Sequence, residues 1–331
     1  MPHRLGLTGD VMLGRLVDEY QQRRPASAVW GDLEDRLRDL DGLFVNLECC
    51  LSARGRQWRR TERAFHFRAE PEWAVPALET VGVDACALAN NHVFDYEEEA
   101  LLDTLTHLGT AGIAHAGAGE SREAAFEPAL VTVGDLDVAF VSLTDNSPEY
   151  AAGDDSPGTA YVEIDVDDAE TRAAVEDTLA RARAHDPDLV IVSLHWGPNM
   201  VEEPPEAHQR FARWLVSEGV DVVHGHSAHV FQGVEVYEGR PILYDTGDFI
   251  DDYAVDPRLW NDRSFLFELS VSEDGGPVEL RLLPTEIDDF AVHRASDGAA
   301  QWSRARIQDR SDPFGTTFER EGDALVYRFD R

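Results

Sequence analysis

Five short apolar runs, each followed directly by polar side chains that can bind a metal or carry a proton, constrain this chain most. Near-continuous apolar runs of this length are typical of strands buried on both faces, as in sheets covered by helices. The five runs with their polar ends occupy residues 4–10, 42–48, 84–92, 189–197 and 219–229. Helical patterns alternate with them, at about residues 14–23, 30–40, 72–81, 97–111, 167–184 and 205–218. This alternation predicts an α/β fold.

The polar residues at the strand ends are candidates for one shared site, because ligands in open α/β sheets bind outside the carboxyl ends of the strands. A single Asp after a strand is more often a helix N-cap, and a single His is more often a structural group. Five blocks of one design are not explained in that way, and three of the chain's twelve histidines fall within residues 224–229. The candidates are Asp10, Glu48, Asn91, His92, His195, His226 and His229.

The same blocks resemble the CapA family, the poly-γ-glutamate capsule synthesis proteins, which is related to the calcineurin-like metallophosphoesterases. The matching segments follow the family's order and span residues 5 to about 250. They are GDVMLGR at 9–15, NLE at 46–48, LANNH at 88–92, SLHWG at 193–197, GHSAHVFQG at 225–233 and PILYDTGDF at 241–249. The resemblance implies a four-layer αββα sandwich of metallophosphoesterase type.

The resemblance also implies roles for single residues. His92 corresponds to the histidine that sits beside the substrate. The implied metal ligands are Asp10, Glu48, Asn91, His195 and one or both of His226 and His229.

Four positions depart from the implied pattern. Met12 stands where the metallophosphoesterases have a second ligand histidine, and Glu48 stands where they have a bridging aspartate. An extra residue separates His226 from His229, which leaves open which of the two binds the metal. Asp248 stands where the CapA pattern usually has an asparagine.

Mixed carboxylate, amide and imidazole ligands suit zinc, manganese or iron better than calcium. We therefore expect one or two divalent ions of this kind, and no structural zinc finger, because the cysteines form no pair pattern. Two neighbouring ions can clamp a phosphoryl group and activate water for its hydrolysis. His92 could then protonate the leaving oxygen as a general acid.

Two further residues are catalytic candidates, and each also has a possible structural role. Asp95 either accepts a hydrogen bond from His92 and fixes its tautomer, or caps the helix that begins near residue 97. Arg15 either pairs with a phosphate or carboxylate of the substrate, or is a surface arginine in the first turn of a helix.

The predicted function is metal-dependent hydrolysis of a phosphoester or a related bond in a small-molecule or polymer substrate. One alternative is an enzyme or accessory protein of poly-γ-glutamate or capsular polymer biosynthesis that acts on an amide (γ-glutamyl) bond. The other is a non-catalytic subunit in which the metal site is structural.

Composition indicates where such chemistry takes place. The formal net charge is −35, from 64 acidic and 29 basic residues, and every basic residue other than histidine is arginine. Such a chain repels itself in dilute buffer and is screened by salt, as in proteins of extreme halophiles. This charge argues against nucleic acid and anionic membranes as partners.

Further sequence features predict a cytoplasmic location. Three cysteines form no disulfide framework, no secretory signal is visible, and no run approaches the roughly 18 apolar residues of a membrane span. We also expect one metallophosphoesterase-like domain at 1–285 and a peripheral extension at 286–331. Short strands at about 233–237, 241–244, 265–270 and 278–283 are expected at sheet edges.

Overall fold

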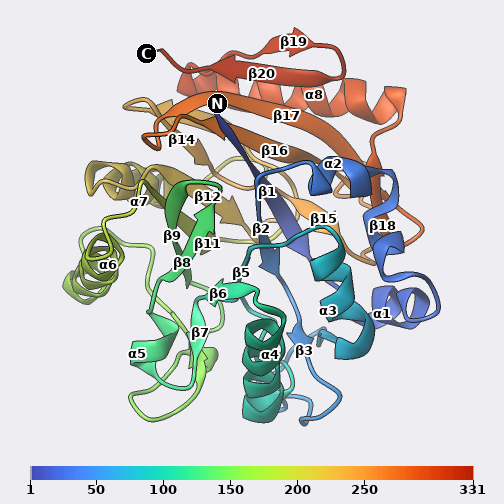
Figure 1. The fold of residues 1–331 in the computed structure, drawn as a ribbon, viewed down its shortest axis with the longest axis vertical. Helices are drawn as coiled ribbons and strands as arrows, with labels where there is room; N and C mark the ends of the chain where they lie inside the picture. The colour runs from blue at the N-terminus through green and yellow to red at the C-terminus, as the bar shows by residue number, and fades with distance from the viewer. Residues whose placement is uncertain (1, 331) are drawn as a thin grey trace.

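The computed structural model describes residues 2–330, whose strands form two large sheets (Figure 1). The larger sheet has the order β19-β20-β17-β16-β1-β2-β5-β6, with β15 paired to β1 and β18 paired to β17. Its strands are β1 (His3–Val11), β2 (Gly42–Leu47), β5 (Ala85–Ala87), β6 (Ala114–Ala116), β15 (Asp248–Ile250), β16 (Arg263–Val271), β17 (Pro277–Asp288), β18 (Ala291–Arg294), β19 (Glu319–Glu321) and β20 (Ala324–Arg328).

The smaller sheet has the order β13-β14-β12-β11-β9-β8. The four strands from β14 to β9 are parallel, and β13 and β8 pair antiparallel at the two edges. Its strands are β8 (Ala129–Val133), β9 (Leu136–Thr144), β11 (Leu189–His195), β12 (Val222–His226), β13 (Val234–Tyr237) and β14 (Arg240–Leu243). Two short pairs stand apart, β3 (Cys50–Leu51) with β4 (Arg68–Ala69) and β7 (Ala118–Gly119) with β10 (Gly158–Thr159).

All six helical ranges expected from the sequence are confirmed to within a few residues. The range 30–40 is a 3-10 segment that continues into a short α-helix. Two α-helices were not expected, the short α5 and the 15-residue α8, and neither were the 3-10 segments η2 and η3. The helices are α1 (Arg15–Gln21), η1 (Ala26–Leu33), α2 (Glu34–Arg38), α3 (Pro71–Thr80), α4 (Glu97–Ala111), α5 (Arg122–Ala125), η2 (Pro148–Tyr150), α6 (Ala169–Arg183), α7 (Glu206–Ser217), α8 (Asp297–Ser311) and η3 (Asp312–Phe314).

Three apolar cores hold these elements together, and the mixed α/β class is confirmed. One core joins inward-facing residues of the two sheets, such as Leu7, Phe140 and Ile191. A second core contains Leu101 of α4 with residues of the larger sheet, and a third contains Phe211 of α7 with residues of the smaller one. In Figure 1, α6 and α7 accordingly lie on the side opposite α1 and α3.

The expectation of sheet edges holds for β13 but is wrong for β14, β16 and β17. Strand β14 lies between β12 and β13. Strand β16 pairs with β1 on one side and with β17 on the other, and β20 then covers β17. Strand β17 is not an edge because the chain after residue 285 adds β18 and β20, which pair with it, together with β19 and α8. Ile307 of α8 and Leu325 of β20 belong to the core between the sheets, so this segment supplies apolar surface to that core.

The three cysteines are buried and form no disulfide. Among the helices of residues 2–330, none is both long enough and apolar enough to cross a membrane.

Candidate metal centre

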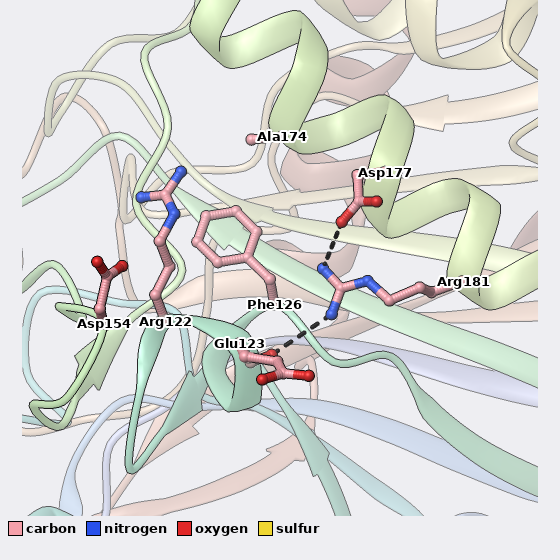
Figure 2. Close-up of a pocket in the computed structure, with 7 residues that line it drawn as sticks. All are labelled: Arg122, Glu123, Phe126, Asp154, Ala174, Asp177 and Arg181. Carbon is pink, nitrogen blue, oxygen red and sulfur yellow. Dashed lines mark hydrogen bonds and ion pairs between the residues drawn. The ribbon is translucent and has the colours of Figure 1, made fainter.

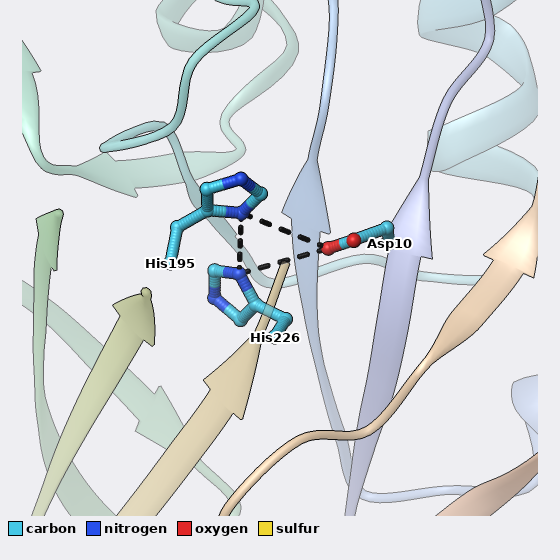
Figure 3. A group of neighbouring side chains, drawn as sticks. All are labelled: Asp10, His195 and His226. Carbon is cyan, nitrogen blue, oxygen red and sulfur yellow. Dashed lines mark hydrogen bonds and ion pairs between the residues drawn. The ribbon is translucent and has the colours of Figure 1, made fainter. Parts of the chain in front are cut away.

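Side chains from the ends of three strands of the two sheets meet at one point. Asp10 comes from β1 of the larger sheet, and His195 and His226 come from β11 and β12 of the smaller one (Figure 3). Asp10 Oδ1 lies 3.9 Å from His195 Nδ1 and 3.6 Å from His226 Nδ1, and the two nitrogens are 2.9 Å apart. Metal bonds of about 2.0–2.2 Å place tetrahedral donors roughly 3–4 Å apart, so these three atoms suit one ion.

A second group of donors lies on the other side of Asp10. Donor atoms of Asp10, Glu48 and His229 all lie within 4.8 Å of one another. His229 Nδ1 is 3.5 Å from Asp10 Oδ2 and 2.8 Å from Asp248 Oδ1. His226 and His229 therefore both enter the cluster, one facing each oxygen of the same carboxylate.

Two glycines allow the strands to approach closely enough for this convergence. A Cβ atom at Gly9 would lie 1.9 Å from the carbonyl oxygen of Gly247, and one at Gly225 would lie 2.1 Å from that of Tyr244. Asp10 N–H donates to Gly247 O at 2.9 Å, which holds β15 beside β1. Any side chain at these glycines would push apart the strands that carry the cluster.

Neighbouring polar groups orient the candidate ligands. Asn46 Nδ2 donates to Asp10 Oδ1 at 2.7 Å, and Asn90 Nδ2 donates to Asn46 Oδ1 at 3.1 Å. Ser193 Oγ lies 2.8 Å from His226 Nε2, so the other nitrogen of that ring faces the cluster. Such outer contacts fix the orientation of metal-binding side chains. Sequence reasoning did not assign these residues a role, although Asn46 and Ser193 lie inside the recognised motifs.

The cluster collects buried polar atoms that have no hydrogen-bond partner within residues 2–330. Buried polar groups are nearly always paired, so a concentration of unpaired acceptors needs a physical cause. Donor atoms of this kind fit a divalent cation, which accepts electron pairs from several ligands at once. The unpaired atoms of the cluster are Asp10 Oδ2, Glu48 Oε1 and Oε2, His195 Nε2, Asp248 Oδ2 and Asp251 Oδ2. Asn91 Oδ1, next to His92 in the chain, is buried and unpaired as well.

Burial sets the protonation of the candidate ligands. It raises the pKa of Asp10 and of Glu48 well above the ordinary values, because a carboxylate loses its hydration there. It lowers the pKa of His195 and His226 well below the ordinary value, and nearby imidazoles add to that effect. These shifts favour the neutral imidazoles that bind metals, and they make protons compete more strongly with a cation for the carboxyl groups.

His92 lies at the edge of the cluster, and its ring contacts Asp95 and Phe67. Its Nδ1 is 2.5 Å from Asp95 Oδ2, its ring stacks on Phe67 at 3.7 Å, and its Nε2 is 3.9 Å from Glu48 Oε1. Asp95 also accepts hydrogen bonds from Phe67 N–H and from the Tyr150 hydroxyl. Asp95 does not cap a helix, because α4 begins after Tyr96 and has no side-chain cap. Asp95 thus contacts Nδ1 of His92, while Nε2 lies on the side of Glu48.

Arg15 is the first residue of α1, as its alternative reading expected, and it lies against the aromatic residues that lead to His92. Its side chain is 29% exposed, its guanidinium sits 4.5 Å over the ring of Phe65, and its Nε is 3.4 Å from Asp252 Oδ2. Phe65 in turn stacks on Phe67, the residue that contacts His92. Nη1 of Arg15 has no hydrogen-bond partner within residues 2–330.

A second arginine near the site was missed from the sequence. Arg63 donates to Asn91 O and to Ser147 Oγ, and its Nε lies 3.4 Å from Asp95 Oδ1. It thereby joins the loop before β4 to the loops that carry Asn91 and His92. The signal available in the sequence was its setting among six arginines at 54–68.

Two other features do not belong to the site. His224, the first histidine of its run, lies with Nε2 2.8 Å from Thr8 O and so links β12 to β1. A surface hollow of about 530 Å³ lies between α5 and α6 (Figure 2). Its Arg181 pairs with Asp177, and Arg122 lies over Phe126. The candidate metal ligands do not line this hollow.

Comparison with known proteins agrees with the motif resemblance. A relative named "Probable polyglutamine synthesis accessory protein" from Mycobacterium tuberculosis is 35% identical over 315 residues, which cover 90% of this chain and 80% of the relative. "Capsule biosynthesis protein CapA" of Bacillus anthracis is 29% identical, over 74% of this chain and 59% of the relative. "PGA biosynthesis protein CapA" of Bacillus subtilis is 26% identical, over 74% and 62%.

The family described as "Bacterial capsule synthesis protein PGA_cap" matches residues 4–253, which include every candidate metal ligand discussed above. This match covers most of the chain, and the resemblance to CapA proteins is thereby confirmed. The chain belongs to the PGA_cap family of bacterial capsule synthesis proteins.

Proposed function

We propose that this protein is a metal-dependent hydrolase that cleaves a phosphoester or a related bond. The arrangement of three apolar cores around two sheets supports a four-layer αββα sandwich of metallophosphoesterase type. In this proposal residues 1–285 carry the CapA-type domain, and residues 286–331 are its C-terminal extension.

The observation that carries the proposal is the cluster of buried, unpaired donor atoms around Asp10, next to the His92–Asp95 pair. A purely structural metal site needs ligands, but it does not require a further imidazole at its edge that a carboxylate orients, as Asp95 orients His92. That pair disfavours the non-catalytic alternative.

Each side chain has a role in the proposed reaction. The proposed ligands are Asp10, Glu48, Asn91, His195, His226 and His229. Bound divalent ions of manganese, zinc or iron would polarise the bond to be cleaved and make water more acidic. His92 donates a proton from Nε2 to the leaving oxygen, while Asp95 holds Nδ1 and keeps the ring oriented. Arg15 binds a charged oxygen of the substrate.

The segment 54–68, here called the arginine segment, supports an anionic substrate. It has six arginines and one acidic residue in a chain of net charge −35. Arg56 and Arg59 are exposed and form no ion pair or hydrogen bond with residues 2–330. Arg59 lines a hollow of about 620 Å³ together with Trp58, Arg63 and His66. Guanidinium groups bind both carboxylates and phosphates through paired hydrogen bonds.

The names of the relatives favour a second candidate, action on an amide (γ-glutamyl) bond during poly-γ-glutamate or capsule synthesis. A polycarboxylate would suit the arginine segment as well as a phosphorylated substrate would. The halophilic character expected from the charge and the cytoplasmic location expected from other sequence features remain part of the proposal.

Elemental analysis of the purified protein tests the proposal, followed by a phosphatase, phosphodiesterase and peptidase panel in molar salt. His195→Ala is the control, because it removes a proposed ligand and should lose metal and activity together. A protein that binds no divalent metal, or one whose activity is the same in His195→Ala, contradicts the proposal.

A further inference from the structure

We propose that Arg310 of α8 is a positioning residue of the candidate metal centre, and that it acts by holding the loop that carries His229. This loop, residues 227–233, is here called the His229 loop. The inference rests on the proposed metal-dependent function, because it requires His229 to bind a metal. It gives a role to a helix that lies beyond residues 4–253, the part of the chain that the family matches.

The guanidinium group of Arg310 joins two loops that follow strands of the smaller sheet. Its Nη1 donates to the carbonyl oxygen of Phe231, in the His229 loop, and its Nη2 pairs with Glu202, in the loop after β11. Its Cζ lies 4.6 Å from the centre of the Phe231 ring. The side chain of Arg310 is 7% exposed, so water competes little for these contacts. Arg310 therefore ties the His229 loop to the loop that follows His195.

The His229 loop has a strained backbone near its histidine. The φ angles of Ser227 and His229 are 110° and 59°, in the left-handed region that residues other than glycine disfavour. Each residue held in such a conformation costs about 1–3 kcal/mol, and it persists only where surrounding contacts enforce it. A loop released from those contacts would relax and move the imidazole of His229 away from Asp10 and Glu48.

Further contacts with α8 fix the end of the same loop. Gly233 approaches α8 so closely that a Cβ atom there would lie 2.1 Å from the carbonyl oxygen of Arg310. Ser311 Oγ, the next residue of α8, accepts a hydrogen bond from Val234 N–H at 2.9 Å. Helix α8 thus restrains the chain from Phe231 to Val234, which begins only two residues beyond His229.

A competing role for Arg310 is to stabilise the fold alone, through the same ion pair and ring contact. The two roles differ in how Arg310 and His229 combine. If Arg310 acts through His229, its removal cannot weaken metal binding further once the imidazole is gone. If Arg310 only stabilises the fold, its removal has the same effect on metal binding with and without His229, because independent changes add.

The test is the Kd of the full chain for Mn²⁺, measured by calorimetric titration of metal-free protein in molar potassium chloride. Arg310→Ala should raise the Kd by about 10- to 100-fold, as other losses of contacts that orient a metal ligand do. In a His229→Ala background, the same change should alter the Kd by no more than about twofold.

Arg310→Lys should raise the Kd less than Arg310→Ala does, because an ammonium group keeps the charge but not the paired geometry of a guanidinium. Near-ultraviolet circular dichroism checks that each variant folds. Arg310→Lys, alone and in the His229→Ala background, carries the same comparison if Arg310→Ala does not fold.

Arg306→Ala is the matched control. Arg306 lies one turn earlier in α8, is 47% exposed and is 3.9 Å from Asp309, so its removal should leave the Kd unchanged. The inference is overturned if Arg310→Ala binds Mn²⁺ as tightly as wild type, or if its loss is as large in the His229→Ala background. It is also overturned if His229→Ala by itself leaves the Kd unchanged. Wild-type protein that binds no Mn²⁺ overturns the proposed function as well.

Discussion

The substitution His92→Ala distinguishes a role of His92 as proton donor from a role as metal ligand. It also has a cost in the free energy of unfolding. The change removes one hydrogen bond to a charged group and one ring stack. Asp95 keeps hydrogen bonds from Phe67 N–H and the Tyr150 hydroxyl, so it is not left unpaired. We expect a loss of about 2–4 kcal/mol in the free energy of unfolding, which leaves most single domains folded.

The expected effect of His92→Ala on catalysis depends on the leaving group of the substrate. A general acid contributes about 10²- to 10⁴-fold, or roughly 2.7–5.5 kcal/mol of activation free energy. That contribution is needed only when the leaving oxygen is a strong base. The loss in kcat/KM should therefore be about 10²-fold or more for an alkyl phosphate ester, and about tenfold or less for a nitrophenyl ester. The assay compares the two esters with Mn²⁺ in molar potassium chloride.

His208→Ala is the matched control for this substitution. His208 is also buried and stacks on an aromatic ring, that of Trp196 at 4.5 Å, but it contacts none of the candidate ligands. His208→Ala should retain metal, and any loss in its kcat/KM relative to wild type should be the same for both esters. The reasoning is refuted if His92→Ala loses metal as completely as His195→Ala, or if it slows both esters equally.

Three further expectations can be checked with simpler measurements. Burial raises the pKa of Asp10 and Glu48, so the metal-free folded protein binds protons there more tightly than the unfolded chain does. The metal-free fold therefore loses stability as pH rises above the pKa values of these groups in the unfolded chain. The gain in Tm on adding Mn²⁺ should be larger at pH 8 than at pH 5.5, and an equal gain contradicts this. Tm should rise between dilute and multimolar potassium chloride as the charge of −35 is screened, and a Tm indifferent to salt removes the halophile argument. Arg59→Ala should raise KM several-fold for polyanionic substrates with little change in kcat or in metal content; an unchanged KM excludes this contact.

Elements with strong local signals were predictable. The helix at 97–111 matches α4 residue for residue, since its apolar spacing and the glycine after it determine both its period and its end. Helix α8 was not anticipated, because it has mostly polar residues and no clear apolar face in sequence. Its buried Ile307 becomes part of the core only through contact with a sheet built from distant segments.

The site shows the same division. Local sequence was sufficient to identify Asp10, His195 and His226 as residues at the ends of buried strands, because apolar runs and strand ends are properties of a few adjacent residues. Which side of Asp10 each histidine faces, and whether Asp248 joins them, depended on the register of β1 with β15 and on the packing of the two sheets. Such contacts join residues far apart in the chain, as from Thr246 to Thr8, which are 238 positions apart, and no short-range pattern encodes such pairings.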